Sequence, residues 1–346
     1  MQRLRCRLAV VLATLMTMYG AALAQAPQAP QASTAAPRCT GQDILAEIRA
    51  RQPAEWAEIR EAADRTLNAR SIFWRVEGAN GPPSYLFGTI HLSDDRINAL
   101  PVEVQLALGA AKKVVLEVAD LSPQALSAAF ARQRPIMVFA DGRSLETMLT
   151  PQEKAVAAGA LEKAGMPATA LAALKPWVVN MMLSLSDCER HRAAAGLRPL
   201  DLRLGDNARQ RGVPVLGLET LADQLLALAA VPEDDQLTVL RAGLKLYDRT
   251  DDLLETMVLG YLARDIGPIW PMHEVLWRQL GYAPKAFASF QKQLVTIRNL
   301  RMRDAAIPLL AEGGAFIAVG ALHLSGAGGL VELLRGAGFK VTPGEQ

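Results

Sequence analysis

Short apolar runs and longer amphipathic stretches alternate along this chain. An apolar run of four to six residues bounded by Gly, Pro, Asn or Asp is typical of a buried strand. Such runs predict strands at 71–77, 84–90, 113–118, 213–218, 315–319 and 339–342. Turn residues fill positions 78–83, so the first two strands should form a hairpin.

Apolar residues at helical spacing separate these strands. They predict helices within 43–68, 101–111, 202–211, 221–230, 236–246, 252–265, 286–310 and 330–336, and almost throughout 122–195. Proline should break the pattern at Pro135 and kink or shorten the last long helix at Pro308. We therefore expect an α/β fold with a short-stranded central sheet flanked by helices, in one domain at 41–346. A large helical insertion should occupy about 122–200 and 221–310.

The start of the chain has the pattern of a secretory signal peptide. Arg3, Arg5 and Arg7 precede the apolar run 8–18, and an Ala-x-Ala sequence ends at Ala24. We expect cleavage after Ala24 and a periplasmic or secreted protein; the alternative is an uncleaved anchor. Residues 25–40 are rich in Ala, Pro and Gln, which predicts a disordered linker.

Charge and hydropathy narrow the classes of partner. The 37 basic and 35 acidic residues give a net charge of +2, and removal of three arginines with the signal peptide leaves 34 against 35. A chain so close to neutral argues against a nucleic-acid partner. No later apolar stretch is long enough to span a bilayer, so we expect no stable membrane span after cleavage.

Cys39 and Cys188 remain after cleavage. Two thiols in an oxidising compartment predict one disulfide between them. A cysteine metal site is the alternative. It would need further ligands, and only His191 lies near Cys188 in sequence.

Two copies of one motif stand out near opposite ends of the domain. Gly88 is followed after three residues by His91, and Gly320 by His323, each with Leu-Ser after the histidine and an apolar run before it. With 26 glycines and 4 histidines, composition alone predicts roughly 0.3 such spacings. One such histidine is usually a satisfied core residue, but the matched pair indicates function. Each glycine should allow a close approach of backbone or ligand.

Glu117 and Glu219 share the placement of the two histidines, because each follows an apolar strand. If these strands are parallel neighbours, all four side chains meet at the sheet edge where α/β proteins bind ligands. We predict that His91, His323 and Glu117 hold a divalent Mn, Co or Zn ion. Glu117 is a ligand or general base and Glu219 a second acid. The alternative for each glutamate is a strand-end residue facing solvent.

Arg298 lies on a helix with an apolar stripe, from which it could stabilise an oxyanion or hold Glu117 or Glu219. A solvated helix face is the alternative. Arg96 is a weaker candidate, and we interpret Asp201 as a helix-start residue rather than an orienting acid. Two further histidines lack the preceding glycine and strand, and we interpret them as structural or surface residues: His191 and His273.

Together these motifs resemble the TraB/GumN family, whose wider superfamily includes Tiki metallopeptidases and erythromycin esterase-like and ChaN-like proteins. The resemblance covers about 73–341 and rests on the segments 86–91, 100–101, 114–117, 218–224, 298–302 and 319–330. It implies an α/β fold with a site made by both Gly-x-x-His motifs, acidic residues and an arginine. It also implies metal-dependent peptidase activity, as in the Tiki relatives.

Three functions follow from the sequence. The first is an exported metal-dependent hydrolase that acts on a peptide or another small molecule. The second is a metal-free, esterase-type hydrolase that uses His91 as its base. The third is a non-catalytic ligand-binding protein with the same cleft. The substrate and the oligomeric state do not follow from the sequence.

Overall fold

The computed structural model describes residues 41–344. The predicted signal peptide, the predicted linker and Cys39 lie outside the described residues. Among the residues described, no helix combines the length and the apolar character that crossing a membrane requires.

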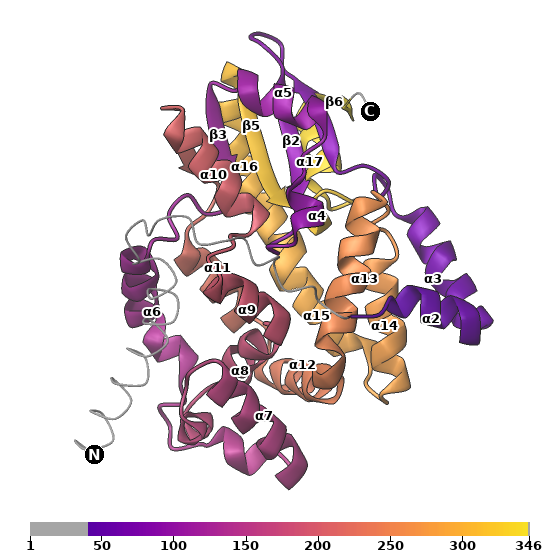
Figure 1. Ribbon diagram of the computed structural model, residues 1–346, viewed down its shortest axis with the longest axis vertical. Coiled ribbons are helices and arrows are strands. Elements are labelled where there is room, and N and C mark those ends of the chain that lie inside the picture. Colours follow the sequence, from indigo (N-terminus) through magenta and orange to yellow (C-terminus); the bar gives the residue numbers. More distant parts are fainter. Residues whose placement is uncertain (1–40, 345–346) are drawn as a thin grey trace.

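A six-stranded sheet forms the centre of the fold, with most helices gathered below it in the view of Figure 1. Its strands are β1 (Phe73–Glu77), β2 (Ser84–Thr89), β3 (Lys113–Leu116), β4 (Val215–Gly217), β5 (Ala315–Gly320) and β6 (Lys340–Pro343). Their order is β4-β3-β5-β2-β1-β6. The first four in this order are parallel, and β1 is antiparallel to both β2 and β6. The predicted strands, the hairpin and the α/β class are thus confirmed.

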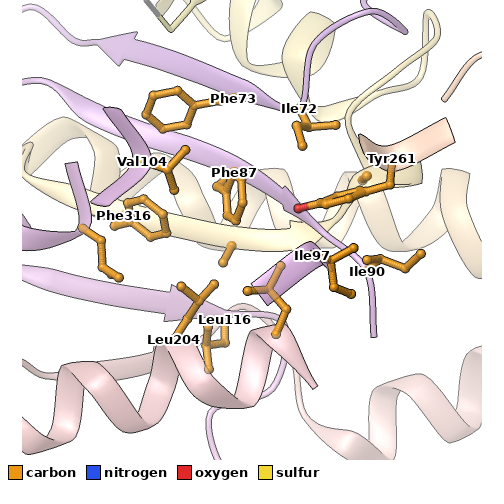
Figure 2. Packing of buried hydrophobic residues seen from close by; sticks show 14 of the residues in the cluster. Ile72, Phe73, Phe87, Ile90, Ile97, Val104, Leu116, Leu204, Tyr261 and Phe316 are labelled. Atoms are coloured by element: carbon orange, nitrogen blue, oxygen red, sulfur yellow. The ribbon is translucent and has the colours of Figure 1, made fainter. Parts of the chain in front are cut away.

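The parallel strands are apolar on both faces because helices cover both faces. Phe87 of β2 and Phe316 of β5 pack in a cluster that includes Val104 of α5 (Val102–Ala110) and Leu204 of α10 (Leu200–Gln210), as Figure 2 shows. On the opposite face, Ile317 of β5 packs with apolar residues of α16 (Ile297–Glu312) and α17 (Leu330–Gly336). The sheet is therefore a rigid support for the loops at its ends.

Several helices form a separate apolar cluster beyond the sheet. The α-helices that contribute to this cluster are α6 (Pro123–Met137), α7 (Pro151–Lys163), α8 (Pro176–Leu183), α11 (Leu221–Ala229) and α12 (Glu233–Leu246). The helices α9 (Asp187–Ala194), α13 (Thr250–Leu262), α14 (Ile269–Gln279) and α15 (Pro284–Gln291) lie outside it. The remaining α-helices are α2 (Ile44–Arg51), α3 (Pro53–Arg65) and α4 (Asp95–Asn98). The division of the domain into sheet and insertion stays a prediction.

The helix break predicted at Pro135 and the shortening allowed for at Pro308 do not occur. Helix α6 continues through Pro135 to Met137, and α16 continues through Pro308 to Glu312. Leu310 beyond Pro308 is buried against the sheet; this burial offsets the hydrogen bond that proline cannot make. Helix α14 was not predicted.

Candidate active site

The four strand-end residues predicted to converge do so. His91 and His323 follow the adjacent parallel strands β2 and β5, while Glu117 follows β3 and Glu219 follows β4. Glu117 Oε1 lies 3.8 Å from His91 Nε2 and 3.9 Å from His323 Nε2. Both glutamate side chains are buried, so neither is a solvent-facing strand end.

The glycines of the two motifs allow this convergence. A Cβ on Gly320 would lie 3.3 Å from Glu117 Oε1, 3.4 Å from His323 Cδ2 and 3.7 Å from His91 Nε2. A Cβ on Gly88 would lie 2.8 Å from Leu324 Cδ1. Because glycine has no side chain, strand β2 approaches the second histidine loop, and the three ionisable groups gather around Gly320. The predicted close approach of backbone is confirmed at Gly88, where a Cβ would also lie 2.9 Å from Ala321 Cα, whereas Gly320 makes room for side chains.

Arg298 joins the two carboxylates. Its Nη2 donates to Glu117 Oε2 at 2.6 Å and also contacts Glu219 Oε1, while its Nε donates to Glu219 at 3.0 Å. Its Nη1 faces Leu294 O at 3.1 Å and His323 Nε2 at 3.3 Å. A guanidinium has five N–H groups, and each is directed at an acceptor here. Of the roles expected for Arg298, the structure favours holding the glutamates over binding an oxyanion.

The helix carrying Arg298 also fixes His323. A π-helical turn at Lys292–Thr296 precedes α16. The Asn299 amide nitrogen donates to His323 O at 3.2 Å and to Gly328 O at 2.8 Å, so its oxygen accepts from His323 Nδ1 at 2.6 Å. This leaves a lone pair on Nε2, facing Arg298. Burial, with the nearby positive charges of Arg298 and His91, lowers the pKa of His323 to about 4, although Glu117 opposes the change.

Glu117 is ionised in this setting. Burial alone would raise its pKa, but the attraction of His323, His91 and Arg298 and a hydrogen bond from Gly320 N–H lower it to about 2. Because His323 is itself neutral at pH 7, the cations that hold Glu117 ionised there are His91 and Arg298. Gln224 Nε2 bridges the two carboxylates, at 3.1 Å from Glu117 and 3.0 Å from Glu219.

His91 differs from these groups because 56% of its side chain is exposed. Its Nδ1 lies 3.1 Å from Asp201 Oδ1, a buried oxygen with no hydrogen-bond partner of its own among the described residues. The Asp201 carboxylate is the main cause that raises the pKa of His91 to about 9; Glu117 adds to it, and desolvation opposes it. Asp201 does lie in the first turn of α10. This position agrees with our interpretation of Asp201 as a helix-start residue, and an orienting role toward His91 stays a proposal.

The arrangement does not fit the predicted metal ion. An ion shared by His91, His323 and Glu117 would need the lone pair of His323 Nε2, and Arg298 Nη1 lies 3.3 Å from that atom. Both oxygens of Glu117 already accept hydrogen bonds. Within 41–344, no three side chains of His, Cys, Asp or Glu form a group able to hold an ion. Hydrogen bonds thus occupy the atoms of His323 and Glu117 that would bind an ion in this arrangement. Metal binding by His91, His323 and Glu117 stays a prediction that nothing here tests.

The other residues singled out in the sequence lie elsewhere. Arg96 pairs with Asp94 and Glu255 instead of reaching the site. His273 stacks on Phe287, and its Nδ1 lies 2.8 Å from Ile269 O, in a structural setting. His191 is exposed on α9. Cys188 is buried on the same helix, and its pairing with Cys39 remains a prediction because Cys39 lies outside the described residues.

Fold and site together define an α/β protein in which two Gly-x-x-His loops, two carboxylates and one arginine meet at the carboxyl edge of parallel strands. The sequence profile of the TraB/PrgY/gumN family matches residues 72–343, and the chain belongs to this family. The resemblance seen in the motifs is thus confirmed.

Two similar relatives are both described as uncharacterized protein YbaP. The one from Shigella flexneri is 25% identical over 256 residues, which cover 73% of this chain and 88% of the relative. The one from Escherichia coli (strain K12) is 25% identical over 255 residues, which cover 72% and 87%. No solved structure matches this chain.

Proposed function

We propose that this protein is an exported hydrolase of ester or amide bonds that uses His91 as a general base, without a metal. The observation that carries the proposal is the placement of the His91 ring. Asp201 contacts its Nδ1, its Nε2 is directed toward Glu117, and more than half of the side chain is accessible. This is the nucleophile-activating arrangement of an imidazole oriented by a carboxylate.

The chemistry follows from the two ring nitrogens. His91 acts in its neutral form, which predominates above its pKa of about 9. In that form it takes a proton from a water molecule on Nε2, and the water oxygen attacks the substrate carbonyl. The imidazolium then gives this proton to the leaving alcohol or amine as the carbon–oxygen or carbon–nitrogen bond breaks. The Asp201 carboxylate stabilises the imidazolium between these two steps.

The other ionisable groups are less suited to the role of base. The low pKa of Glu117 makes it a weak base, and Arg298, Gln224 and Gly320 already donate to its oxygens. His323 is buried, with Nε2 facing Arg298. Glu117, Glu219 and Arg298 therefore serve as an ion-paired wall beside the base.

The proposal is tested with a panel of esters and peptides, after exhaustive chelation. We expect turnover by the wild type to survive chelation and to be lost in His91→Ala. His191→Ala, which removes an exposed histidine elsewhere, should keep full activity. Turnover by His91→Ala would reject the proposal. Activity that chelation removes and Mn, Co or Zn restores would favour the metal-dependent alternative.

Export and the disulfide are separate parts of the proposal. The support for export is the charged, apolar and Ala-x-Ala sequence at residues 1–24. Protein recovered from the periplasm or medium should begin at Gln25. Its intact mass should rise by two hydrogens on reduction, because Cys39 and Cys188 are paired. A chain that keeps Met1, or two free thiols in exported protein, would contradict these parts.

A further inference from the structure

The loop carrying His91 is held by a buried polar network that the proposed chemistry does not use. The backbone N–H and the hydroxyl of Ser93 donate to Glu189 Oε2, at 3.0 and 2.7 Å. Arg192 Nη1 donates to Glu189 Oε1 at 2.7 Å, and its Nη2 donates to Asp94 Oδ2 at 3.1 Å. All four side chains are buried, so water does not substitute for any of these partners.

Four consecutive loop residues each have a partner in the short span 189–201. His91 contacts Asp201, the Leu92 carbonyl accepts from Leu200 N–H at 3.2 Å, Ser93 binds Glu189, and Asp94 binds Arg192. Helix α9 supplies Glu189 and Arg192, and the start of α10 supplies the other two. The α9–α10 span therefore sets the path of the backbone on both sides of the His91 ring.

The second histidine loop is fixed by different means. Asn299 alone binds the ring and the carbonyl of His323 and the carbonyl of Gly328. In the first loop, no residue within 41–344 binds both the ring and the backbone in this way, so the ring depends on the position of the backbone. Glu189 is the acceptor that fixes this backbone, and Arg192 compensates its buried charge.

We propose that Glu189 is a positioning residue, which holds the Ser93 backbone and hydroxyl so that the His91 ring stays against Asp201. This inference rests on the proposed role of His91. A charged side chain buried between a helix and the loop of the reacting histidine contributes fixed geometry rather than net stability.

Glu189→Asp is the appropriate variant, because it keeps the charge and withdraws the carboxylate by one methylene. Relaxation of the ring carbons in histidine-labelled protein measures the order of each imidazole separately. We expect an order parameter near that of rigid backbone, about 0.85, for His91 in the wild type and below about 0.6 in the variant. His323, held by Asn299, should stay ordered in both. Glu58→Asp, which alters an exposed pair with Arg278, is the matched control.

A folded Glu189→Asp protein whose His91 ring stays as ordered as in the wild type would overturn the inference, as would equal loss of order at both rings. Should Glu189→Asp fail to fold, Ser93→Ala removes one hydrogen bond and is judged by the same measurement. Where hydrolysis is measurable, kcat should fall roughly tenfold with KM little changed. A loosened His91 ring in a protein without hydrolytic activity would reject the proposed function and leave the inference intact.

Discussion

Asp201→Asn tests the electrostatic origin of the proposed base. The substitution keeps the shape of the side chain and an oxygen that can face His91 Nδ1, but it removes the negative charge. Asp201 is the largest cause of the rise in the pKa of His91 to about 9. The variant should therefore lower this pKa, leaving the smaller effect of Glu117 in place.

The size of the change in the pKa of His91 depends on how strongly water screens the Asp201 charge. Unit charges about 4 Å apart attract by about 1 kcal/mol in bulk water and about 4 kcal/mol near a protein surface. Because 56% of the His91 side chain is exposed, we take the lower part of this range, about 1–2 kcal/mol. At 1.36 kcal/mol per unit, the pKa of His91 should fall by about one unit.

Nuclear magnetic resonance titration of the four histidines measures this pKa directly. His91→Ala assigns the signal, and Asp206→Asn, on the same helix but paired with Arg198 and Arg209, is the control. Because a general base acts unprotonated, kcat/KM should rise with pH through the pKa of His91. In Asp201→Asn, this rise should move to lower pH by the same amount.

The sign of the effect on stability follows from the same pKa. A raised histidine pKa contributes stability that is fully present below pH 6.5 and lost as the pH rises through about 9. Asp201→Asn should reduce this contribution. An unchanged or higher pKa of His91 in the variant would refute the reasoning, because the Asp201 charge would then not act on the ring.

Three further predictions concern stability and are measured by urea unfolding. Arg298→Met leaves two buried carboxylates without their cation and should lower the free energy of unfolding by about 3–5 kcal/mol. The exposed Arg278→Met should lower it by about 1 kcal/mol or less. Equal losses would contradict the buried pairing of Arg298 with Glu117 and Glu219. Gly88→Ala meets Leu324 and should cost about 1–3 kcal/mol, while Gly109→Ala, in open space on α5, should stabilise by up to about 1 kcal/mol. The unfolded chain protonates His323 near pH 6.5 but the folded one only near 4, so stability should fall over this window by up to about 3 kcal/mol as the pH drops. His323→Gln should flatten that fall.

The sheet and its reactive edge were predictable because local pattern determines both. Each strand is an apolar run between turn residues, and the strand-end position of Glu117 or His323 is visible in the sequence. The convergence at one edge followed once those strands were taken as parallel. Helix ends at proline were less predictable, because burial of Leu310 favours the continuation of α16 past Pro308.

The pairing of Arg298 with the two glutamates was among the expectations, but the other partners of the site residues could not be predicted. Asp201 and Glu189 are acidic residues in first helical turns, and this position alone explains them. Only the packing of α9 and α10 against the 91–94 loop gives them a second role. Likewise, the N–H groups of Arg298 Nη1 find acceptors only in the Leu294 carbonyl and the His323 lone pair. The positions of these acceptors depend on the three-dimensional fold.

The pairing of β2 with β5 places Leu86 beside Ile317. Because the ribosome synthesises the chain from its amino end, Ile317 is added long after Leu86. A nascent chain that ends before β5 has the first histidine loop but neither Arg298 nor the second histidine in place, and β2 and β3 present open edges. Such a fragment exposes unpaired strand edges to proteases and to association with other chains. Truncation that removes β5 and the second histidine loop should therefore abolish activity.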